Sequence, residues 1–523
     1  MKLMRALSPS RQSGARIAAT IFLLELLLLL TPNAWAVPSY SRRYGMECST
    51  CHTMWGALNG AGVTFRLSGY RAIFGKKLAP LVDDIEIAKG VTIPSTLPLS
   101  FITGVGVDSR KEKREQSGAG SSSVTSTGTS LGLEDASIFM TSPLGEHLST
   151  FVEFPMYETR AWEFTPAGNF ESRFNTTPGR QIKFSTESPA FEVAKFFWNN
   201  PLGDAAPTDS VNLLGGITHM PLAYPSGKVR LAVNQYLIYE RTALGLISPH
   251  NVEDVLGGAE NDVVFRLSEP QVLAEANGIL AFGKPLTDTG KKETFWAEYH
   301  AGVTNASNAK AANSSSPGMY GRWIMRYFNQ SLGFYAFHKG DTYSDKIRTN
   351  ASIAGNAGGN GIMSGSQDAN KVTAWGPDMT LSLLPTGVPL SLENQLMYRR
   401  ESNPTGFGRE FKWKGGFHQL NYLMSKTTML YGRFDYLKGD PFDDTGSTVN
   451  GVSGITRSTP KEHDYILGWQ HLYEQNVKFI FEFRHHVFED AATGAAIPGL
   501  GPTSGNAAKL TDNGFTARVM FGF

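Results

Sequence analysis

Several features by which proteins are commonly classified are absent from this sequence. The chain holds only two cysteines among its 523 residues, so any cysteine chemistry is confined to one place. Beyond residue 36, no apolar run reaches the length of about 18 residues that a transmembrane helix requires. Basic and acidic residues nearly balance, at 48 and 47, which gives no reason to expect nucleic acid as a partner. No catalytic triad or paired-carboxylate motif is recognisable either.

The two cysteines stand in the stretch Cys48-Ser49-Thr50-Cys51-His52, which has the Cys-x-x-Cys-His pattern of c-type haem attachment. Thiols three positions apart lie about one helical turn from each other, so both can form thioethers to one porphyrin. The histidine that follows is placed to become the proximal ligand of the iron. We therefore predict one covalently attached haem c, bound by Cys48, Cys51 and His52, with His52 on the iron.

A disulfide, a thioredoxin-like redox pair and half of a zinc site are the other interpretations of this spacing. A structural zinc site needs four ligands, and no second Cys or Cys/His pair stands nearby at ligand spacing. A redox pair is expected within a βαβ unit, and no such pattern is visible here. The sequence favours the haem.

Residues 1–84 are expected to form two segments. Residues 1–36 have a basic start, an apolar core interrupted by Thr20 and Glu25, and small residues up to Ala36, which predicts a secretory signal peptide. The alternative is an uncleaved anchor, for which the apolar run is short and Glu25 costly in lipid. Residues 37–84 follow as a cytochrome c segment that can wall a haem but is too small for a core of its own.

From residue 85 to residue 523 the composition shifts to aromatic residues, Gly, Ser, Asn and Thr, and apolar positions alternate with polar ones. In the stretch Val477–Val487, for example, the odd positions 477 to 483 are apolar. The final stretch puts Phe515, Val519 and Phe523 on one face, which is typical of the last strand of bacterial barrel proteins. Alternation of this kind also occurs in soluble β-sandwiches, so it does not decide alone.

Loop length separates the two fold classes. Short turns are predicted near residues 329–330, 384–387, 425–426 and 473–476, and long polar connections at 341–371, 401–410, 439–461 and 489–512. Outer-membrane barrels alternate in this way, with short periplasmic turns and longer extracellular loops, whereas a sandwich has no reason to do so.

Further strands are predicted upstream, at Leu99–Val107, Gly132–Thr141, Ser149–Met156, Phe191–Trp198, Val211–Ile217, Val229–Glu240 and Thr294–Val303. The stretch Arg241–Pro285 holds one strand pair or none that crosses. We therefore predict an all-β transmembrane fold, an antiparallel outer-membrane β-barrel of 16 or 18 strands over residues 85–523. The monohaem segment is expected to plug its lumen, reached from the periplasm.

The stretches Pro38–Arg42, Gly45-Met46, Cys48–His52 and Phe65–Tyr70 resemble the fused monohaem cytochrome–porins of the bacterial outer membrane. The best known of these are the outer-membrane iron(II)-oxidising cytochromes. The resemblance covers about 35 residues, and the remaining chain agrees in architecture only. That family typically has an aromatic-Pro after the haem motif and a Phe-Gly-Arg before the later aromatic residue. This chain departs from the pattern at Met54-Trp55-Gly56 and Ala61-Gly62-Val63.

The resemblance implies electron transfer across the outer membrane through the haem. The expected donor is extracellular Fe(II) and the expected acceptor a periplasmic c-type cytochrome, which makes the chain a possible Fe(II):cytochrome c oxidoreductase. Outer-membrane lipid is the other expected partner. Two alternatives stay open: export of electrons to an extracellular acceptor, and a solute porin in which the haem is structural or sensory.

The sixth iron ligand is not determined by the sequence. Met46 and Met54 flank the motif too closely to reach the distal face. Candidates from the barrel are His219, Met220, His300, His338, His418, His471, His485 and His486, although each is more readily explained as a surface or girdle residue.

Two charge clusters are expected in long loops. Arg110–Glu115 is interpreted as a solvated face in the first long loop, with contact to an anionic surface as the alternative. Asp440, Asp443 and Asp444 are interpreted as ordinary loop acidity rather than as a site that gathers Fe(II).

Overall fold

The chain divides into two compact units, residues 1–37 and Pro38–Phe523, and only the second is described by this computed structural model. The described residues are 39–54, 56–95, 98–116, 123–158, 163–164, 170–171, 191–226, 229–243, 246, 265–282, 295–306, 317–327, 329–340, 370–404, 409–449, 452–493 and 506–522. The predicted signal peptide, residues 341–369 of the predicted long loop, the side chains of Asp443 and Asp444, and the last residue lie outside the described part.

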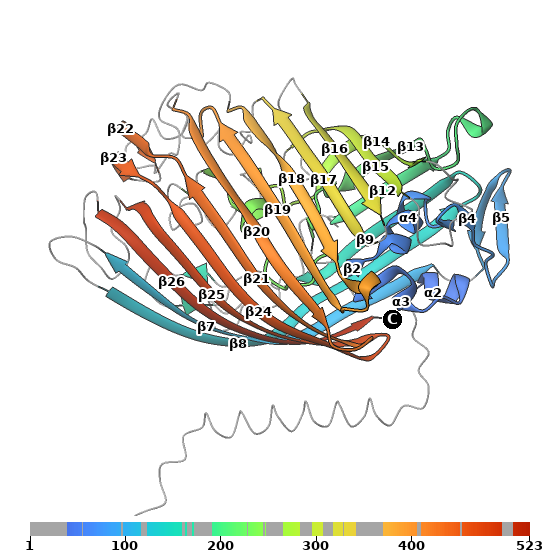
Figure 1. Ribbon diagram of the computed structural model, residues 1–523, viewed down its shortest axis with the longest axis horizontal. Helices are drawn as coiled ribbons and strands as arrows, with labels where there is room; N and C mark the ends of the chain where they lie inside the picture. Colours follow the sequence, from blue (N-terminus) through green and yellow to red (C-terminus); the bar gives the residue numbers. More distant parts are fainter. Residues whose placement is uncertain are drawn as a thin grey trace, which may run out of the picture. The chain divides into compact units, whose positions relative to one another are not determined.

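Sixteen strands form a closed antiparallel barrel, which confirms the smaller of the two predicted strand numbers (Figure 1). Each strand pairs with its neighbours in chain order, and β26 closes the barrel against β7. The barrel strands are β7 (Leu99–Gln116), β8 (Ser123–Leu144), β9 (Leu148–Glu158), β12 (Val193–Asn199), β13 (Asn212–Thr218), β14 (Gln271–Phe282), β15 (Phe295–Thr304), β16 (Gly318–Tyr327), β17 (Gln330–Lys339), β18 (Val372–Ser382), β19 (Leu390–Glu401), β20 (Phe411–Leu423), β21 (Thr428–Gly439), β24 (Lys461–Glu474), β25 (Val477–Thr493) and β26 (Asn506–Gly522).

Smaller elements lie outside the barrel sheet. The hairpins are β1 (His52–Met54) with β2 (Ala57–Leu58), β3 (Ala72–Ile73) with β4 (Lys76–Lys77), β5 (Asp84–Ala88) with β6 (Val91–Pro94), β10 (Glu163–Phe164) with β11 (Phe170–Glu171), and β22 (Phe442–Val449) with β23 (Val452–Ser458). The helices are α2 (Ser39–Tyr44), α3 (Cys48–Cys51), α4 (Gly60–Leu67) and α5 (Leu237–Glu240), with 3-10 turns η1 (Gly203–Ala205) and η3 (Leu384–Thr386). No helix in the described ranges is long and apolar enough to cross a membrane.

Side chains alternate between the interior and the outer wall of the barrel, because successive residues of a strand point to opposite faces. On β25, Phe481 and Phe483 are 42% and 49% exposed, whereas Glu482 between them is 2% exposed. The same inversion recurs around the barrel, with large apolar residues exposed and carboxylates and arginines buried. The outer wall is therefore apolar and the interior polar.

The connections alternate in length as predicted. Short turns such as 424–427 and 475–476 lie at one end of the barrel, the short-turn end, which also holds the longer connection between β12 and β13, and the longest connections join strands at the other, the long-loop end. One prediction was wrong in detail, because Arg110–Glu115 belongs to β7 rather than to a loop, and its backbone pairs with β8 as far as Glu115. A strand continues wherever its backbone finds a partner, whatever the charge of its outward side chains.

The prediction of a strand at Val229–Glu240 was also wrong. Residues 229–243, the interior segment, run inside the barrel and contain α5, with Tyr236, Ile238 and Tyr239 fully buried. The strand that brings the total to sixteen in its place is β14, which comes from the stretch that the sequence left ambiguous. The interior segment is apolar because it is surrounded on all sides, and such a run resembles a buried strand in sequence.

Inward-facing charges of the wall hold the interior segment in place. The backbone N–H groups of Val233 and Leu237 donate to Glu482 at 2.8 Å and to Asp435 at 3.1 Å. The guanidinium of Arg241 donates to both oxygens of Glu462, at 2.8 and 2.9 Å through Nε. Around these contacts lies the largest apolar cluster of the molecule, which joins the interior segment to strands on several sides of the barrel. The interior of the barrel is therefore partly filled.

Candidate haem-binding site

The predicted haem motif forms a single helical turn followed by a hairpin. Cys48 and Cys51 are the first and last residues of α3, and His52 leaves it in an extended conformation, with φ of −122°. His52 then pairs with Leu58 across the β1–β2 hairpin. The two thiols thus stand one turn apart, as the spacing predicted, and the imidazole comes directly after them.

Asn59 and Gly62 hold this turn against α4. The side-chain amide of Asn59 donates to the carbonyls of Ser49 and Thr50, at 3.3 and 3.1 Å, while its oxygen accepts the Gly62 N–H at 3.0 Å and so caps α4. A side chain at position 62 would meet the carbonyl oxygen of Cys51 at 2.2 Å. Glycine is therefore required for this approach of α4 to the cysteines.

The two thiols form no disulfide and are half-buried. Burial, with the nearby Cys48 as a second cause, raises the pKa of the Cys51 thiol to about 11. Burial also raises the pKa of Cys48. A catalytic redox dithiol needs the opposite, a thiolate stabilised near neutral pH. These properties disfavour the redox pair among the interpretations of the motif.

His52 has the properties of a metal ligand. Its ring is half-buried, and its Nδ1 atom is buried without a hydrogen-bond partner in the described part of the chain. Burial, and then the positive charge of Lys478 on β25, lowers the pKa of His52 to about 4. The imidazole is therefore neutral at pH 7, which is the form that binds iron. Together with two thiols one turn away, it makes a donor set that fits a covalently attached haem.

The motif and the hairpin that follows it contribute to three apolar clusters. Cys51 packs against an aromatic cluster formed by Phe65, Tyr70 and Phe197, in which the rings of Phe65 and Tyr70 lie 5.5 Å apart. Met54 belongs to a second cluster with inward-facing residues of β21 and β24, and Leu58 to a third with residues of β14 and β15. Surroundings of this kind exclude water from a cofactor.

The segment is tied to the short-turn end of the barrel by buried amides. The side chains of Asn199 and Asn212 both donate to the carbonyl of Leu67, the last residue of α4, at 3.0 Å. Arg71 donates to Asn199 at 3.1 Å and to the carbonyl of Gly145 at 3.0 Å. Sequence reasoning missed these residues, because the partners are up to 145 positions apart and no local pattern marks them.

Two further contacts bring the wall to the helices of the site. The Cys48 thiol lies 3.6 Å from the carbonyl of Gln475, in the short turn between β24 and β25. Arg66 of α4 lies 3.6 Å from Glu298 of β15, which also binds Arg326 at 2.7 Å. Figure 1 shows α3 and α4 beside the ends of the strands at the short-turn end.

The proposed sixth ligands are not gathered at the motif. His338, His418, His471 and His485 lie on outward-facing positions of the wall, with their rings bonded to Thr373, Asn394, Thr428 and Asn513. His300 contacts Glu275 and Glu298, and His486 contacts Glu462. The sulfur of Met220 accepts a hydrogen bond from the hydroxyl of Tyr335. His219 is half-buried just after β13, and Met46 packs against the same aromatic cluster as Cys51. In the described ranges no three His, Cys, Asp or Glu residues group as a metal site.

Comparison with known proteins finds no matching family model and no matching curated sequence. Several solved structures are similar in fold. OmpT, an outer membrane protein of Vibrio cholerae, is 8% identical over 84% of this chain and 99% of its own, with a TM-score of 0.41. The outer membrane channel DcaP of Acinetobacter baumannii is 9% identical over 84% and 99%, with a TM-score of 0.40.

The anion-selective porin from Comamonas acidovorans is 10% identical over 81% of this chain and 100% of its own, with a TM-score of 0.41. Similarity of this degree carries no information on function. The porin-like barrel architecture rests on the strand pairing of this chain itself, and the haem site on the residues described above.

Proposed function

We propose that this chain is an outer-membrane electron-transfer cytochrome fused to a porin-like barrel, which passes electrons from extracellular Fe(II) to a periplasmic c-type cytochrome. The observation that chiefly supports the proposal is the position of Cys48, Cys51 and His52. Two free thiols and a neutral, half-buried imidazole stand together at the short-turn end of the barrel. In outer-membrane barrels that end faces the periplasm.

Membrane location is supported by the distribution of polarity. The wall exposes large apolar side chains, among them Trp323, Trp375 and Leu467, and turns charged residues such as Glu482 and Arg433 into the buried interior. A barrel satisfies its backbone hydrogen bonds between strands, so it can cross lipid without an exposed polar edge. In this orientation the haem segment enters the lumen from the periplasmic side.

The residues of the site have separate tasks in this proposal. Cys48 and Cys51 would hold the haem through thioethers and His52 would bind its iron, and the bound group supplies one-electron redox chemistry. Phe65 and Tyr70 keep water away from the cysteines. Fe(II) loses one electron at the long-loop side to become Fe(III), and the periplasmic cytochrome gains one.

The solute porin remains the second candidate because a barrel of 16 strands is wide enough to hold an aqueous channel. The interior segment argues against a wide channel, since Tyr236, Ile238 and Tyr239 are fully buried inside the barrel. Conductance separates the two candidates. A porin would retain or increase its conductance when residues 37–84 are deleted, and an electron conduit would lose Fe(II)-dependent reduction.

Stopped-flow absorbance of the purified, oxidised protein mixed with Fe(II) tests the proposal directly. Rapid appearance of reduced c-haem bands is expected in the wild type and is lost in Cys48→Ala and His52→Ala, with the barrel still assembled. If Fe(II) fails to reduce the protein while dithionite does, and an extracellular acceptor reoxidises it, the electrons flow outward and the direction proposed here is wrong.

A further inference from the structure

The outer wall carries a concentration of positive charge near the long-loop end. Outward-facing basic residues stand on β7, β19, β20, β21, β24 and β26, and four acidic residues stand at the same level. The basic residues are Lys111, Lys113, Arg400, Lys412, Lys414, Lys438, Lys461 and Lys509, and the acidic ones are Glu115, Glu410, Asp440 and Glu489. Among the residues that the structure describes, this charge stands on the side of the barrel that runs from β19 to β7.

Three of these lysines lie side by side across neighbouring strands. Lys414 on β20 pairs with Lys438 on β21, and Lys438 pairs with Lys461 on β24. Like charges directly opposite each other on one face destabilise a sheet. Neither Lys414 nor Lys438 has an ion pair with a carboxylate in the described part of the chain, and Lys414 contacts only the ring of Tyr398, at 5.9 Å. This lysine row has the charge arrangement of an anion site.

Below the lysine row, towards the middle of the wall, lies a belt of rings. Tyr436 stacks with His418 at 6.1 Å and with Phe434 at 5.9 Å, and Phe434 contacts Tyr465 at 4.9 Å. The rings of the first two pairs are within 17° and 19° of parallel, and aromatic girdles mark the boundary of the apolar region in barrels of this kind. Such rings also pack against the apolar faces of sugars.

Below the belt, the absence of a side chain at Gly432 opens an apolar hollow of about 370 Å³. Its walls include Leu420, Leu467 and Phe483, which are 50%, 64% and 49% exposed, and the hollow reaches up to the belt, since His418, Phe434 and Tyr465 also line it. Six residues separate Gly432 from Lys438, which is about 20 Å along a strand. With the usual tilt of barrel strands this is about 15 Å of depth, close to one leaflet of the roughly 30 Å hydrocarbon core.

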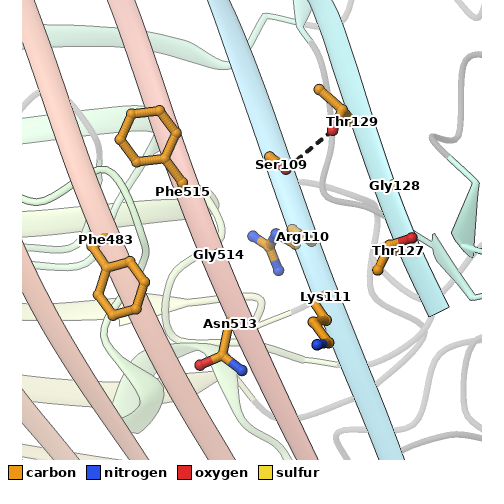
Figure 2. A pocket seen from close by; sticks show the side chains of 10 residues that line it. All are labelled: Ser109, Arg110, Lys111, Thr127, Gly128, Thr129, Phe483, Asn513, Gly514 and Phe515. Atoms are coloured by element: carbon orange, nitrogen blue, oxygen red, sulfur yellow. Dashed lines mark hydrogen bonds between the residues drawn. The ribbon is translucent and has the colours of Figure 1, made fainter. Parts of the chain in front are cut away.

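A second hollow of about 360 Å³ repeats the arrangement on the other side of Phe483 (Figure 2). Figure 2 shows Phe483 and Phe515 at one part of this hollow and Lys111 with Asn513 at another, with Gly514 of β26 between Phe515 and Asn513. The hydroxyls of Ser109 and Thr129, 3.0 Å apart, add donors and acceptors beside it. Cation, polar groups and apolar surface again follow one another along the wall.

We propose that this side of the outer wall binds a phosphorylated glycolipid of the outer leaflet. Lys414, Lys438 and Lys461 hold its phosphate, the ring belt carries its sugar, and the Gly432 hollow receives an acyl chain. The inference rests on the membrane location in the proposed function but not on electron transfer. A free phosphate anion would satisfy the lysines alone, whereas the ring belt and the hollow below them require an amphiphile.

The test uses the full-length, haem-loaded protein in a nonionic detergent, with native mass spectrometry as the measure of affinity. The probes are bisphosphorylated lipid A, its dephosphorylated form, phosphatidylglycerol and inorganic phosphate. Each lysine is worth about fivefold in affinity for an anionic headgroup. Lys414→Gln with Lys438→Gln should therefore weaken binding of the bisphosphorylated lipid about thirtyfold, and the dephosphorylated lipid should bind the wild type equally weakly.

The matched control is Lys76→Gln with Lys77→Gln, two exposed lysines of the N-terminal segment, which should bind the lipid as the wild type does. Gly432→Leu tests the hollow separately, and it should fold, because a Cβ there meets no atom within 4 Å. It should weaken binding of the lipid while leaving the lysine row intact. Without lipid, Lys438→Gln should melt at a higher temperature than the wild type, because the substitution removes the repulsion from Lys414. With lipid, the variant should melt at a lower temperature than the wild type.

Equal affinity for the dephosphorylated lipid, or unchanged binding in the lysine variant, would overturn the proposal. Inorganic phosphate that binds as tightly as the lipid would show an anion site without a lipid, and equal binding of phosphatidylglycerol would remove the role of the sugar. A failure of the membrane location is distinguishable from these results, because the wild-type protein would then stay in solution without detergent.

Discussion

Replacing Gly62 with alanine tests whether α4 positions the cysteines. A Cβ at this position would lie 2.2 Å from the carbonyl oxygen of Cys51 and 2.9 Å from Cδ2 of Leu58. Because the closest atom is backbone, α3 or α4 must move. Gly60, two residues earlier in the same helix, is a matched control, since its Cβ would lie 3.5 Å from the ring of Phe74, an ordinary contact.

The two substitutions should change the stability of this segment in opposite directions. Alanine in place of glycine stabilises a helix by up to about 1 kcal/mol, so Gly60→Ala should stabilise α4 by that amount or less. Overpacking against a rigid neighbour costs about 1–3 kcal/mol. After a helix gain of about 1 kcal/mol is subtracted, Gly62→Ala should destabilise the site by up to about 2 kcal/mol.

Hydrogen exchange over residues 48–67 of the haem-free protein measures this difference, and the yield of covalent haem measures its consequence. Gly62→Ala should exchange about tenfold faster than the wild type in this segment and take up less haem, while thermal unfolding of the barrel strands stays unchanged. Gly60→Ala should match or exceed the wild type in protection. If both variants behave alike, the contact between Gly62 and Cys51 does not hold the cysteines in place.

Three further changes test other parts of the structure. Asn59→Ala should cost about 1 kcal/mol through the lost cap and speed hydrogen exchange in α3, whereas Asn59→Asp should keep the cap and lose only the two bonds to α3. In the haem-free protein His52 has a pKa of about 4 when folded and about 6.5 when unfolded, so the unfolded chain binds more protons. The free energy of local unfolding should be greatest above pH 6.5 and should fall as the pH is lowered to 4. Hydrogen exchange at residues 48–58 measures this fall. The fall should be smaller in Lys478→Met, because loss of the Lys478 charge raises the pKa of His52 in the folded state. Glu462→Gln should loosen the interior segment, because Arg241 and His486 lose their shared carboxylate, and should increase conductance in planar bilayers, while the outer-wall variant Glu410→Gln should not.

Much of the barrel was predictable because its physics is local. Alternation predicted the strands wherever one face is apolar, as in β25, and loop length separated a barrel from a sandwich. β14 was left ambiguous because its outward positions are small residues such as Ala274 and Ala276, while Glu275 and Asn277 point inward. The contrast in hydrophobicity between its two faces is therefore weak. The interior segment gave the opposite error, since Leu237, Ile238 and Tyr239 are apolar without being part of the wall.

The haem motif is a prediction that rests on five consecutive residues alone. The groups that hold it in place were not predictable, since Asn199, Asn212 and Gln475 are ordinary polar residues in sequence and acquire their role only when the barrel register brings them to α3 and α4. The lysine row has the same origin. Lys414, Lys438 and Lys461 are separated by more than twenty positions each and meet only through strand pairing.

The seam between β26 and β7 bears on how the molecule is made. Arg110 and Asp512, which form an ion pair at 2.9 Å across this seam, are 402 positions apart in the chain. Until the last strand has been synthesised, β7 presents an unpaired edge of backbone donors and acceptors, and such edges pair readily with other chains. Contacts over so long a separation also form slowly. The unclosed chain therefore needs a chaperone before it reaches the membrane. A truncation that removes β26 should give an aggregating protein rather than a smaller barrel.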